Sequence, residues 1–209
     1  MAERRVVMVS GGARGLGAAI VRRCLDEGHA VSVGVRRPEA VAEAFADRTD
    51  ATPTAYRYDS DVPETAEAWV EATARDLGPP DTLINNAGIL KIVDFERGTE
   101  DDLDAMWRVN VKGPFRLIKS ALPHLRAHGA GRVVNIASTD GKRYRDRTVS
   151  LGYVLTKQAL ITMTTAARFA GYDDGLRATA ICPGAISNEM IADIPGVTPK
   201  EKRLQPETV

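Results

Sequence analysis

Tyr153 and Lys157 stand four positions apart, in a segment whose apolar spacing predicts a long helix over residues 153–170. Residues at this spacing share one face of a helix, so the lysine ammonium would lie one turn from the tyrosine phenol. A free tyrosine has a pKa of about 10 and is a poor acid or base at neutral pH. A cation one turn away favours the phenolate, and lowering that pKa to neutrality takes roughly 4 kcal/mol. The pair is a candidate for proton transfer, although a Tyr-x-x-x-Lys spacing also occurs often by chance.

A glycine-rich turn, Ser10-Gly11-Gly12-Ala13-Arg14-Gly15-Leu16-Gly17, follows a short apolar segment near the start of the chain. Glycines at this place allow a tight turn and let a phosphate approach the backbone, while the next helix offers its first N–H groups to a pyrophosphate. The spacing differs from the G-x-G-x-x-G pattern and from the P-loop with its lysine. A glycine cluster can also be no more than a turn. Its place after a first strand favours a dinucleotide, and the expected cofactor-binding residues of the turn are Gly11, Arg14, Gly15, Leu16 and Gly17.

The residues after the second predicted strand favour NADP over NAD. Where an NAD site usually offers a carboxylate to the ribose 2′-hydroxyl, this chain has Val35 followed by Arg36 and Arg37. Arg14 adds another positive group, and guanidinium groups bind phosphate through bidentate, charge-assisted hydrogen bonds. The alternative interpretation is that all three arginines are solvated surface residues.

Asp59 and Ser60 follow the third predicted strand. The Asp59 carboxylate could accept a hydrogen bond from an adenine amino group, with the Ser60 N–H beside it. Asp59 could equally be a loop residue or a helix cap near Asp61.

These motifs need a scaffold, and apolar strand-like runs alternate with helical patterns along the whole chain. Such alternation predicts an α/β fold of Rossmann type, a doubly wound parallel sheet with helices on both faces and with ligands beyond the carboxyl ends of the strands. We expect a single dinucleotide-binding domain over residues 1–209. The predicted strands cover residues 6–10, 30–35, 54–58, 82–85, 132–136 and 177–181. The predicted helices cover residues 15–27, a segment after Pro38, 63–77, a segment from Thr99 to about residue 128 that Gly113-Pro114 should kink or divide, and 153–170.

The order of the motifs resembles that of the short-chain dehydrogenase/reductase family over essentially the whole chain. Asn85-Asn86-Ala87-Gly88 closes the fourth predicted strand, Asn110 lies in the following helix, and Ser138 closes the fifth strand. The glycine turn, the Tyr-x-x-x-Lys pair and Pro183-Gly184 complete the set.

The resemblance implies a catalytic group and a set of cofactor contacts. It implies that Tyr153 acts as the acid in reduction and the base in oxidation, and that Lys157 lowers the tyrosine pKa and binds the nicotinamide ribose. It also implies that Ser138 donates a hydrogen bond to the substrate oxygen and that Asn110 holds a water of a proton relay. The further cofactor contacts that it implies are Asn86, Ala87 and Gly88 beside the fourth strand, Pro183 and Gly184 at the start of a loop behind the nicotinamide, Ile186 at the carboxamide, and Asn188.

The chain departs from the family pattern in three places. Fifteen positions separate Ser138 from Tyr153, a wider spacing than usual, so the loop between them should bulge. Asn188 replaces the usual threonine and could still bind a phosphate or an amide. Family members usually continue beyond the position of Val209, so we expect a truncated chain that lacks its last edge strand and leaves the sixth strand with an unpaired edge.

Composition argues against several other classes of protein. The 28 basic residues balance 28 acidic residues, which predicts no nucleic-acid partner and no attraction to an anionic membrane. No apolar run approaches the ~20 residues of a membrane span, and the amino terminus does not resemble a signal peptide. Cys24 and Cys182 form no disulfide framework, and His124 and His128 lack a third ligand, so we expect a cytoplasmic protein without a metal.

The sequence therefore predicts an NADP(H)-dependent oxidoreductase that moves a hydride between nicotinamide and a small carbonyl or secondary alcohol. The alternatives are a 3-oxoacyl carrier-protein reductase and a redox sensor that binds NADP(H) without turnover. Basic residues in the loop over residues 139–147 could favour an anionic substrate or could belong to a solvated loop. The family resemblance also implies a homodimer or homotetramer.

Overall fold

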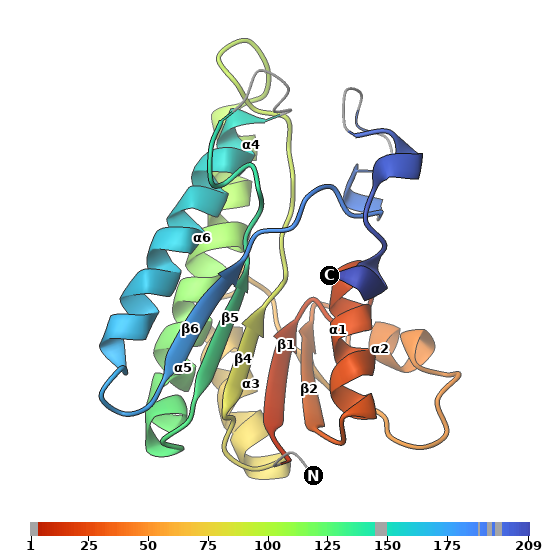
Figure 1. Ribbon diagram of the computed structural model, residues 1–209, viewed down its shortest axis with the longest axis vertical. Helices are drawn as coiled ribbons and strands as arrows, with labels where there is room; N and C mark the ends of the chain where they lie inside the picture. Colours follow the sequence, from red (N-terminus) through yellow and green to blue (C-terminus); the bar gives the residue numbers. More distant parts are fainter. Residues whose placement is uncertain (1–3, 145–149, 188, 192–193, 195–197) are drawn as a thin grey trace.

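Six parallel strands form one sheet in the computed structural model, which describes residues 4–144, 150–187, 189–191, 194 and 198–209. The strand order is β3-β2-β1-β4-β5-β6, so the chain builds one half of the sheet from β1 outward and then the other half from β4 outward (Figure 1). This is the predicted Rossmann-type, doubly wound topology. The strands are β1 (Val6–Ser10), β2 (Ala30–Val35), β3 (Thr54–Arg57), β4 (Thr82–Asn85), β5 (Arg132–Ile136) and β6 (Arg177–Ile181).

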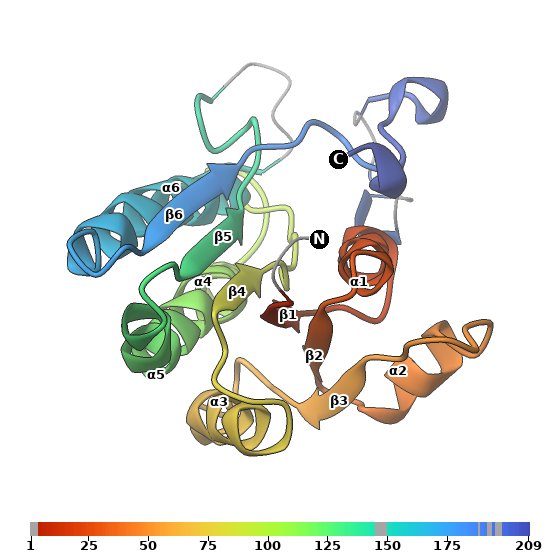
Figure 2. The ribbon, with the colours of Figure 1, turned by 60° about the horizontal axis from the view of Figure 1, so that its bottom comes forward.

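Helices cover both faces of this sheet. Figure 2 shows α1 and α2 on one face and α3, α5 and α6 on the other. No helix in the described part of the chain is long and apolar enough to cross a bilayer. The helices are α1 (Gly15–Asp26), α2 (Glu39–Ala44), α3 (Glu64–Asp76), α4 (Glu100–Trp107), the π-helical turn η1 (Arg108–Lys112), α5 (Gly113–Ala127) and α6 (Leu151–Ala170), followed by the short 3-10 segments η2 (Glu189–Ile191), η3 (Lys200–Lys202) and η4 (Pro206–Thr208).

The apolar runs locate the strands closely. Five strands begin and end at the predicted residues, and β3 ends at Arg57, one residue before its predicted end. The helix that carries Tyr153 begins earlier than predicted, at Leu151, because Ser150 caps it by accepting a hydrogen bond from the Tyr153 N–H. The periodicity of the apolar residues therefore locates this helix, while the Ser150 cap sets its first residue.

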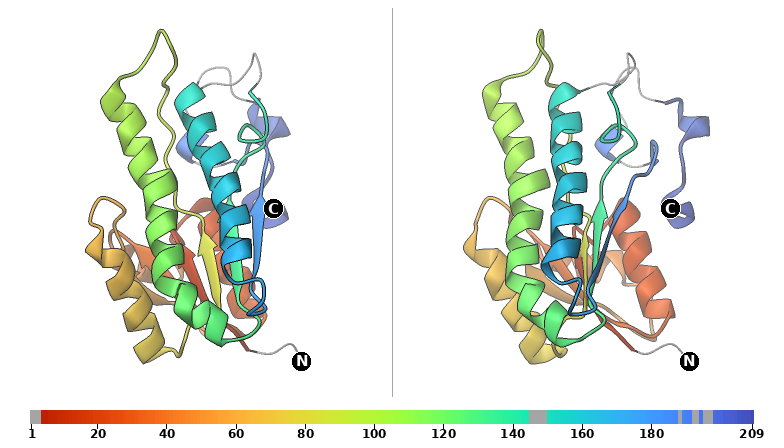
Figure 3. Two further views of the ribbon diagram at one scale, coloured as in Figure 1. Left: turned by 90° about the vertical axis from the view of Figure 1, so that its left-hand side faces the viewer. Right: turned by 60° about the vertical axis from the view of Figure 1, so that its left-hand side comes forward.

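The helical segment after Thr99 is divided just before Gly113-Pro114, as predicted. Thr99 caps α4 by accepting a hydrogen bond from the Asp102 N–H. The π-helical turn η1 then joins α4 to α5, and the three segments run on as one rod beside α6 (Figure 3). Pro114 has no N–H to donate to the preceding turn, which favours a change of helix type just before it. Turns of π-helix are often found at functional sites. Asn110 lies in this turn.

Two apolar layers hold the helices on the sheet, because alternate residues of each strand point to opposite faces. On the α3, α5 and α6 face the core includes Met8, Leu83 and Trp69. On the α1 and α2 face it includes Val9 and Val33. The strands β1, β2 and β4 are buried on both faces and read as largely apolar runs, which is why the sequence predicts them, whereas β6 at the edge of the sheet is partly exposed.

Residues after β6 return across the sheet toward α1. Leu204 forms an isolated parallel bridge with Ile186, and η4 packs against α1 (Figure 1). Within the part of the chain that the structure describes, β6 pairs with β5 alone, so its other edge has no strand beside it.

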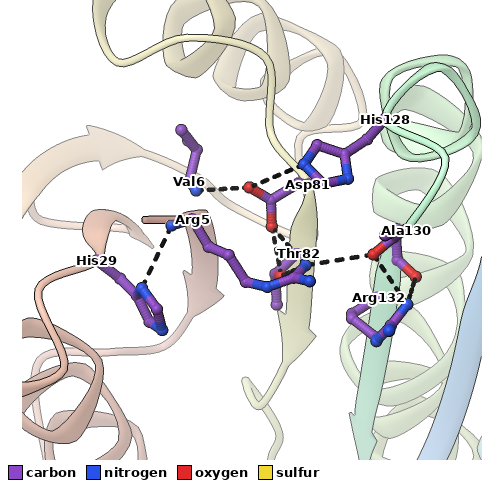
Figure 4. A network of polar contacts seen from close by, with 9 residues as sticks. Arg5, Val6, His29, Asp81, Thr82, His128, Ala130 and Arg132 are labelled. Atoms are coloured by element: carbon purple, nitrogen blue, oxygen red, sulfur yellow. Dashed lines mark hydrogen bonds and ion pairs between the residues drawn. The ribbon is translucent and has the colours of Figure 1, made fainter. Parts of the chain in front are cut away.

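A buried carboxylate ties the amino ends of the strands together, at the edge opposite the predicted ligand sites (Figure 4). Asp81 accepts hydrogen bonds from the Val6 N–H at 2.8 Å and the Thr82 hydroxyl at 2.7 Å, and pairs with the Arg5 guanidinium at 3.1 Å. The same guanidinium donates to the Ala130 carbonyl at 3.3 Å. Asp81 is therefore a structural carboxylate that joins β1, β4 and the turn before β5.

Replacing Asp81 with Asn should lower the free energy of unfolding by about 2–4 kcal/mol, because the charge that pairs with Arg5 is lost and one of the two acceptor oxygens becomes an NH2 group that faces another donor. Urea denaturation followed by circular dichroism measures the change. The control is Asp47→Asn, which breaks an exposed ion pair with Arg22 and should have a much smaller effect. Equal losses in the two variants would show that the Asp81 network contributes no more than a surface pair.

Candidate functional site

The glycine turn after β1 packs tightly against the residues that follow β4. Gly11 has a φ of +69°, and a Cβ built on it would lie 3.1 Å from the Ala87 Cα. A Cβ on Gly17 would lie 2.2 Å from the Gly11 carbonyl oxygen and 2.6 Å from the Asn86 Nδ2. A side chain at Gly11 would crowd Ala87 and one at Gly17 would collide with the Gly11 carbonyl, so the turn packs this closely only with glycine at both positions. Cofactor binding by Gly11, Gly15, Leu16 and Gly17 stays a prediction.

Ser10 fastens the turn to the end of β4. Its hydroxyl accepts hydrogen bonds from the Asn86 N–H at 3.0 Å and the Ala87 N–H at 3.1 Å. The Asn86 side-chain amide donates in return to the carbonyls of Ser10 and Gly11, at 3.0 and 3.1 Å. The structure thus brings the glycine turn and the segment from Asn86 to Gly88 together. We did not predict the role of Ser10, although its place as the last residue of a buried strand was a usable signal.

The arginines expected at the ribose phosphate lie at the carboxyl end of β2 and in the glycine turn. Arg36 and Arg37 are exposed, and neither guanidinium bonds to another residue that the structure describes. Arg14 is the N-cap residue of α1, with an extended backbone. Two exposed cations that form no ion pair with a described residue give this corner of the sheet positive charge.

Asp59 and Ser60 follow β3, and their side chains are partly used within the protein. One Asp59 carboxylate oxygen accepts the Asp61 N–H at 3.0 Å, which is the local turn considered as the alternative to adenine binding. The Ser60 hydroxyl points inward and donates to the Tyr58 hydroxyl at 3.1 Å. The second Asp59 oxygen has no hydrogen-bond donor among the described residues, so an adenine contact is still compatible with this geometry.

Tyr153 and Lys157 lie on one face of α6, as their spacing predicts. The Lys157 Nζ is 5.5 Å from the centre of the Tyr153 ring. Lys157 is 4% exposed, and its ammonium donates to the Ile136 carbonyl at the end of β5, at 2.7 Å. Burial lowers the pKa of Lys157 to about 8.

Burial raises the pKa of the Tyr153 phenol above its ordinary value, and the Asp140 carboxylate acts in the same direction. We expected the pKa to be lowered by the neighbouring ammonium. The direction is the opposite in this structure, and the cost of removing the phenolate from water is its largest cause. The phenol is therefore in its protonated form at neutral pH and can act as a proton donor.

Asn110 and Lys157 both lie next to Gly88. Its Oδ1 accepts the Ile89 N–H at 2.9 Å, and its Nδ2 donates to the Ile89 carbonyl at 2.9 Å and to the Thr156 hydroxyl at 3.1 Å. A Cβ on Gly88 would lie 3.3 Å from the Asn110 Oδ1 and 3.5 Å from the Lys157 Nζ. The structure therefore brings Gly88, Asn110 and Lys157 together. The Asn110 side chain uses its oxygen and its NH2 group in hydrogen bonds to Ile89 and Thr156.

Ser138 follows β5 at the same edge of the sheet. Its hydroxyl oxygen accepts the Asp140 N–H at 3.2 Å, which leaves the hydroxyl proton available to a ligand. The loop then lies against α6, because a Cβ on Gly141 would be 2.8 Å from the Lys157 Cβ. This close approach anchors the start of the long loop. Much of the rest of that loop, including Arg145 and Arg147, is outside the described residues.

The segment after β6 passes beside the loop that carries Ser138 and continues to the face of the sheet that α1 covers. The Pro183 carbonyl accepts the Thr139 N–H at 2.9 Å, and Gly184 follows it. The bridge to Leu204 uses the Ala185 carbonyl and the Ser187 N–H, so neither peptide group of Ile186 is consumed by it. The contact between Ile186 and a carboxamide stays a prediction, and Asn188 lies outside the described residues.

Two further features to locate are the possible metal ligands and the basic loop after β5. Among the residues that the structure describes, no three His, Cys, Asp or Glu side chains cluster as a metal site would require. Lys142 and Arg143 of the basic loop are exposed and form no ion pair with a described carboxylate.

The sequence of this chain is similar to a protein-family model and to several known enzymes. A family model described as short chain dehydrogenase matches residues 5–196. An agropine synthesis reductase of Rhizobium rhizogenes is 37% identical over 188 residues, which are 90% of this chain and 43% of that protein. An acetoacetyl-CoA reductase of Shinella zoogloeoides is 34% identical over 194 residues, which are 91% of this chain and 78% of that protein. The chain thus spans less than half the length of the agropine synthesis reductase.

The fold of this chain is also similar to that of a solved structure. The crystal structure of a blue fluorescent protein from a metagenomic library, in complex with NADPH, superposes with a TM-score of 0.81 at 31% identity and covers 92% of this chain and 79% of that chain. The family match over most of the chain, the sequence relatives and the shared fold lead to one conclusion. The chain belongs to the short-chain dehydrogenase/reductase family of oxidoreductases.

Proposed function

We propose that this protein is an NADP(H)-dependent oxidoreductase that interconverts a carbonyl group and a secondary alcohol, with Tyr153 as its acid and base. The observation that carries the proposal is the buried Lys157 ammonium beside a protonated phenol, at the carboxyl edge of a sheet whose first strand leads through a tightly packed glycine turn into α1. Ligands of doubly wound sheets bind at this edge.

The glycine turn and the α1 amino terminus fit a dinucleotide. Gly11 and Gly17 let the turn pack closely against Ala87 and Asn86, and the turn leads directly into α1, whose first N–H groups can bind a phosphate. In the proposed complex the turn holds the pyrophosphate, and the backbone of Ile186 holds the nicotinamide carboxamide. When bound, the reduced nicotinamide supplies the hydride.

The proposed preference for NADP(H) depends on Arg14, Arg36 and Arg37. A ribose 2′-phosphate is a dianion that suits guanidinium groups, and Val35 puts no carboxylate at the position that an NAD site usually needs. The NADPH found in the similar metagenomic protein supports the same choice.

In carbonyl reduction Tyr153 would donate the proton that the new alkoxide oxygen needs. Burial keeps the phenol protonated, so the donor is in the correct form before the reaction. The Lys157 ammonium would then stabilise the phenolate that remains, and the Ser138 hydroxyl would donate a hydrogen bond to the oxygen while negative charge develops on it.

The substrate class that we propose is a small carbonyl compound, and a 3-oxoacyl thioester is one member of it. The acetoacetyl-CoA reductase relative and the exposed cations of Lys142 and Arg143 support an anionic thioester carrier.

We also propose that two copies pair through α5 and α6, whose exposed Phe115, Leu155 and Phe169 are apolar.

Tyr153→Phe should lower turnover by about a thousandfold, because the ring remains but the transferable proton is lost, while NADPH affinity should stay within about threefold. Loss of the reduced nicotinamide absorbance against a panel of carbonyl compounds measures turnover, and NADPH fluorescence measures binding. A variant that retains more than about a tenth of the activity would exclude Tyr153 as the acid.

Arg36→Asp should weaken NADPH relative to NADH by on the order of 10- to 100-fold, since one charged hydrogen bond to phosphate is lost and a repulsion is added. Fluorescence titrations with both cofactors give the ratio. Arg75→Asp on α3, an exposed site on the other face of the sheet, makes the same change in net charge and should leave the ratio unaltered. The same change in both variants would mean that only the overall charge matters.

The rate of carbonyl reduction should be level at neutral pH and fall as the pH rises through about 8, because Lys157 then loses the charge that stabilises the phenolate. The measurement is kcat/KM for the carbonyl compound at saturating NADPH across the neutral and alkaline range. A rate that climbs steadily through the alkaline range would contradict the role of the Lys157 ammonium.

A further inference from the structure

The peptide groups of Tyr153 are held from both sides by buried side-chain hydroxyls of its own helix. The Ser150 Oγ accepts the Tyr153 N–H at 3.2 Å, and the Thr156 Oγ1 donates to the Tyr153 carbonyl at 2.8 Å. Ser150 is 1% exposed and Thr156 is not exposed at all. The two hydroxyls therefore stand three residues before and three residues after the proposed acid.

Each hydroxyl continues to the segment that follows β4. The Ser150 Oγ donates to the Lys91 carbonyl at 2.7 Å and accepts the Val93 N–H at 3.3 Å. The Thr156 Oγ1 accepts the Asn110 Nδ2 at 3.1 Å, and the same amide holds both peptide groups of Ile89. The backbone of Tyr153 is thus linked at two points to residues 89–93, which directly follow the proposed cofactor contact Gly88.

We propose that Thr156 and Ser150 are positioning residues that fix the Tyr153 phenol relative to the cofactor edge of β4, an inference that depends on the proposed function. A hydroxyl bonded only to the preceding turn would be an ordinary helical threonine. Here the second bond of Thr156 goes to Asn110, on another element, so losing the hydroxyl releases the turn that carries Tyr153 from its neighbour. Proton transfer is sensitive to such displacements, because a shift of about 1 Å can cost a hundredfold in rate.

Thr164 provides a matched control two turns further along α6. Its hydroxyl donates to the Leu160 carbonyl at 2.8 Å and accepts the Asn135 Nδ2 at 2.8 Å. Thr164 is 5% exposed, so it resembles Thr156 in burial and in both kinds of partner, but its carbonyl acceptor is not that of Tyr153. Valine keeps the shape of threonine without the hydroxyl, so Thr156→Val and Thr164→Val each remove one equivalent network.

In a carbonyl reduction assay, Thr156→Val should lose on the order of 10- to 100-fold in kcat with KM for the carbonyl compound within about twofold. Thr156→Ser keeps the hydroxyl and should restore most of the rate. Thr164→Val should retain kcat although its urea midpoint falls as much as that of Thr156→Val. Ser150→Ala should behave as Thr156→Val does. Equal kcat values for the two valine variants, or failure of the serine variant to restore the rate, would overturn the proposal.

Hydrogen exchange of the same proteins, followed by mass spectrometry, separates this proposal from the proposed function. Thr156→Val should speed exchange both in peptides covering residues 86–94 and in peptides covering 150–157, whereas Thr164→Val should leave both unchanged. If the wild-type protein turns over no carbonyl compound, the proposed function fails, and the exchange result alone decides whether Thr156 links the two segments. Unchanged exchange in Thr156→Val would overturn that link whatever the activity.

Discussion

A buried ammonium group is the constraint on which the arrangement of this site depends. Removing a cation from water is costly, and Lys157 is almost completely buried with one carbonyl, that of Ile136, as its hydrogen-bond acceptor in the described structure. That bond joins α6 to the end of β5 at the place where Ser138 follows. Gly141 must lack a side chain, because a Cβ there would lie 2.8 Å from the Lys157 Cβ, and a Cβ on Gly88 would lie 3.5 Å from the Lys157 Nζ and 3.3 Å from the Asn110 Oδ1. The lowered pKa of Lys157 is the physical sign of this cost.

The two ends of the sheet use buried charge in different ways. At the amino end, Asp81 is saturated with donors and joins several strands, which suits a purely structural role. At the carboxyl end, Lys157 has a carbonyl partner and no described carboxylate beside it, while the Ser138 proton is not used within the described structure. A doubly wound fold can therefore concentrate stabilising contacts at one edge and leave polar groups for a ligand at the other.

Most of the scaffold could be predicted from the sequence, because strands buried on both faces are continuous apolar runs and helices between them keep a regular period. The Tyr153 and Lys157 pair could be placed on one helix face by spacing alone. The direction of the Tyr153 pKa shift could not, because it depends on how deeply the phenol is buried, which is set by packing of distant segments. Ser10 and Thr156 were missed for a related reason, since a hydroxyl reveals its partners only when the strands and helices are assembled.

The most direct measurement of the central claim is a crystal structure of the protein with NADP bound. The account predicts that the nicotinamide ribose lies within hydrogen-bond distance of the Lys157 Nζ, with the Tyr153 hydroxyl beside the nicotinamide ring and the 2′-phosphate at Arg36 and Arg37. A cofactor bound elsewhere, or one whose nicotinamide ring is out of reach of both Tyr153 and Lys157, would contradict it.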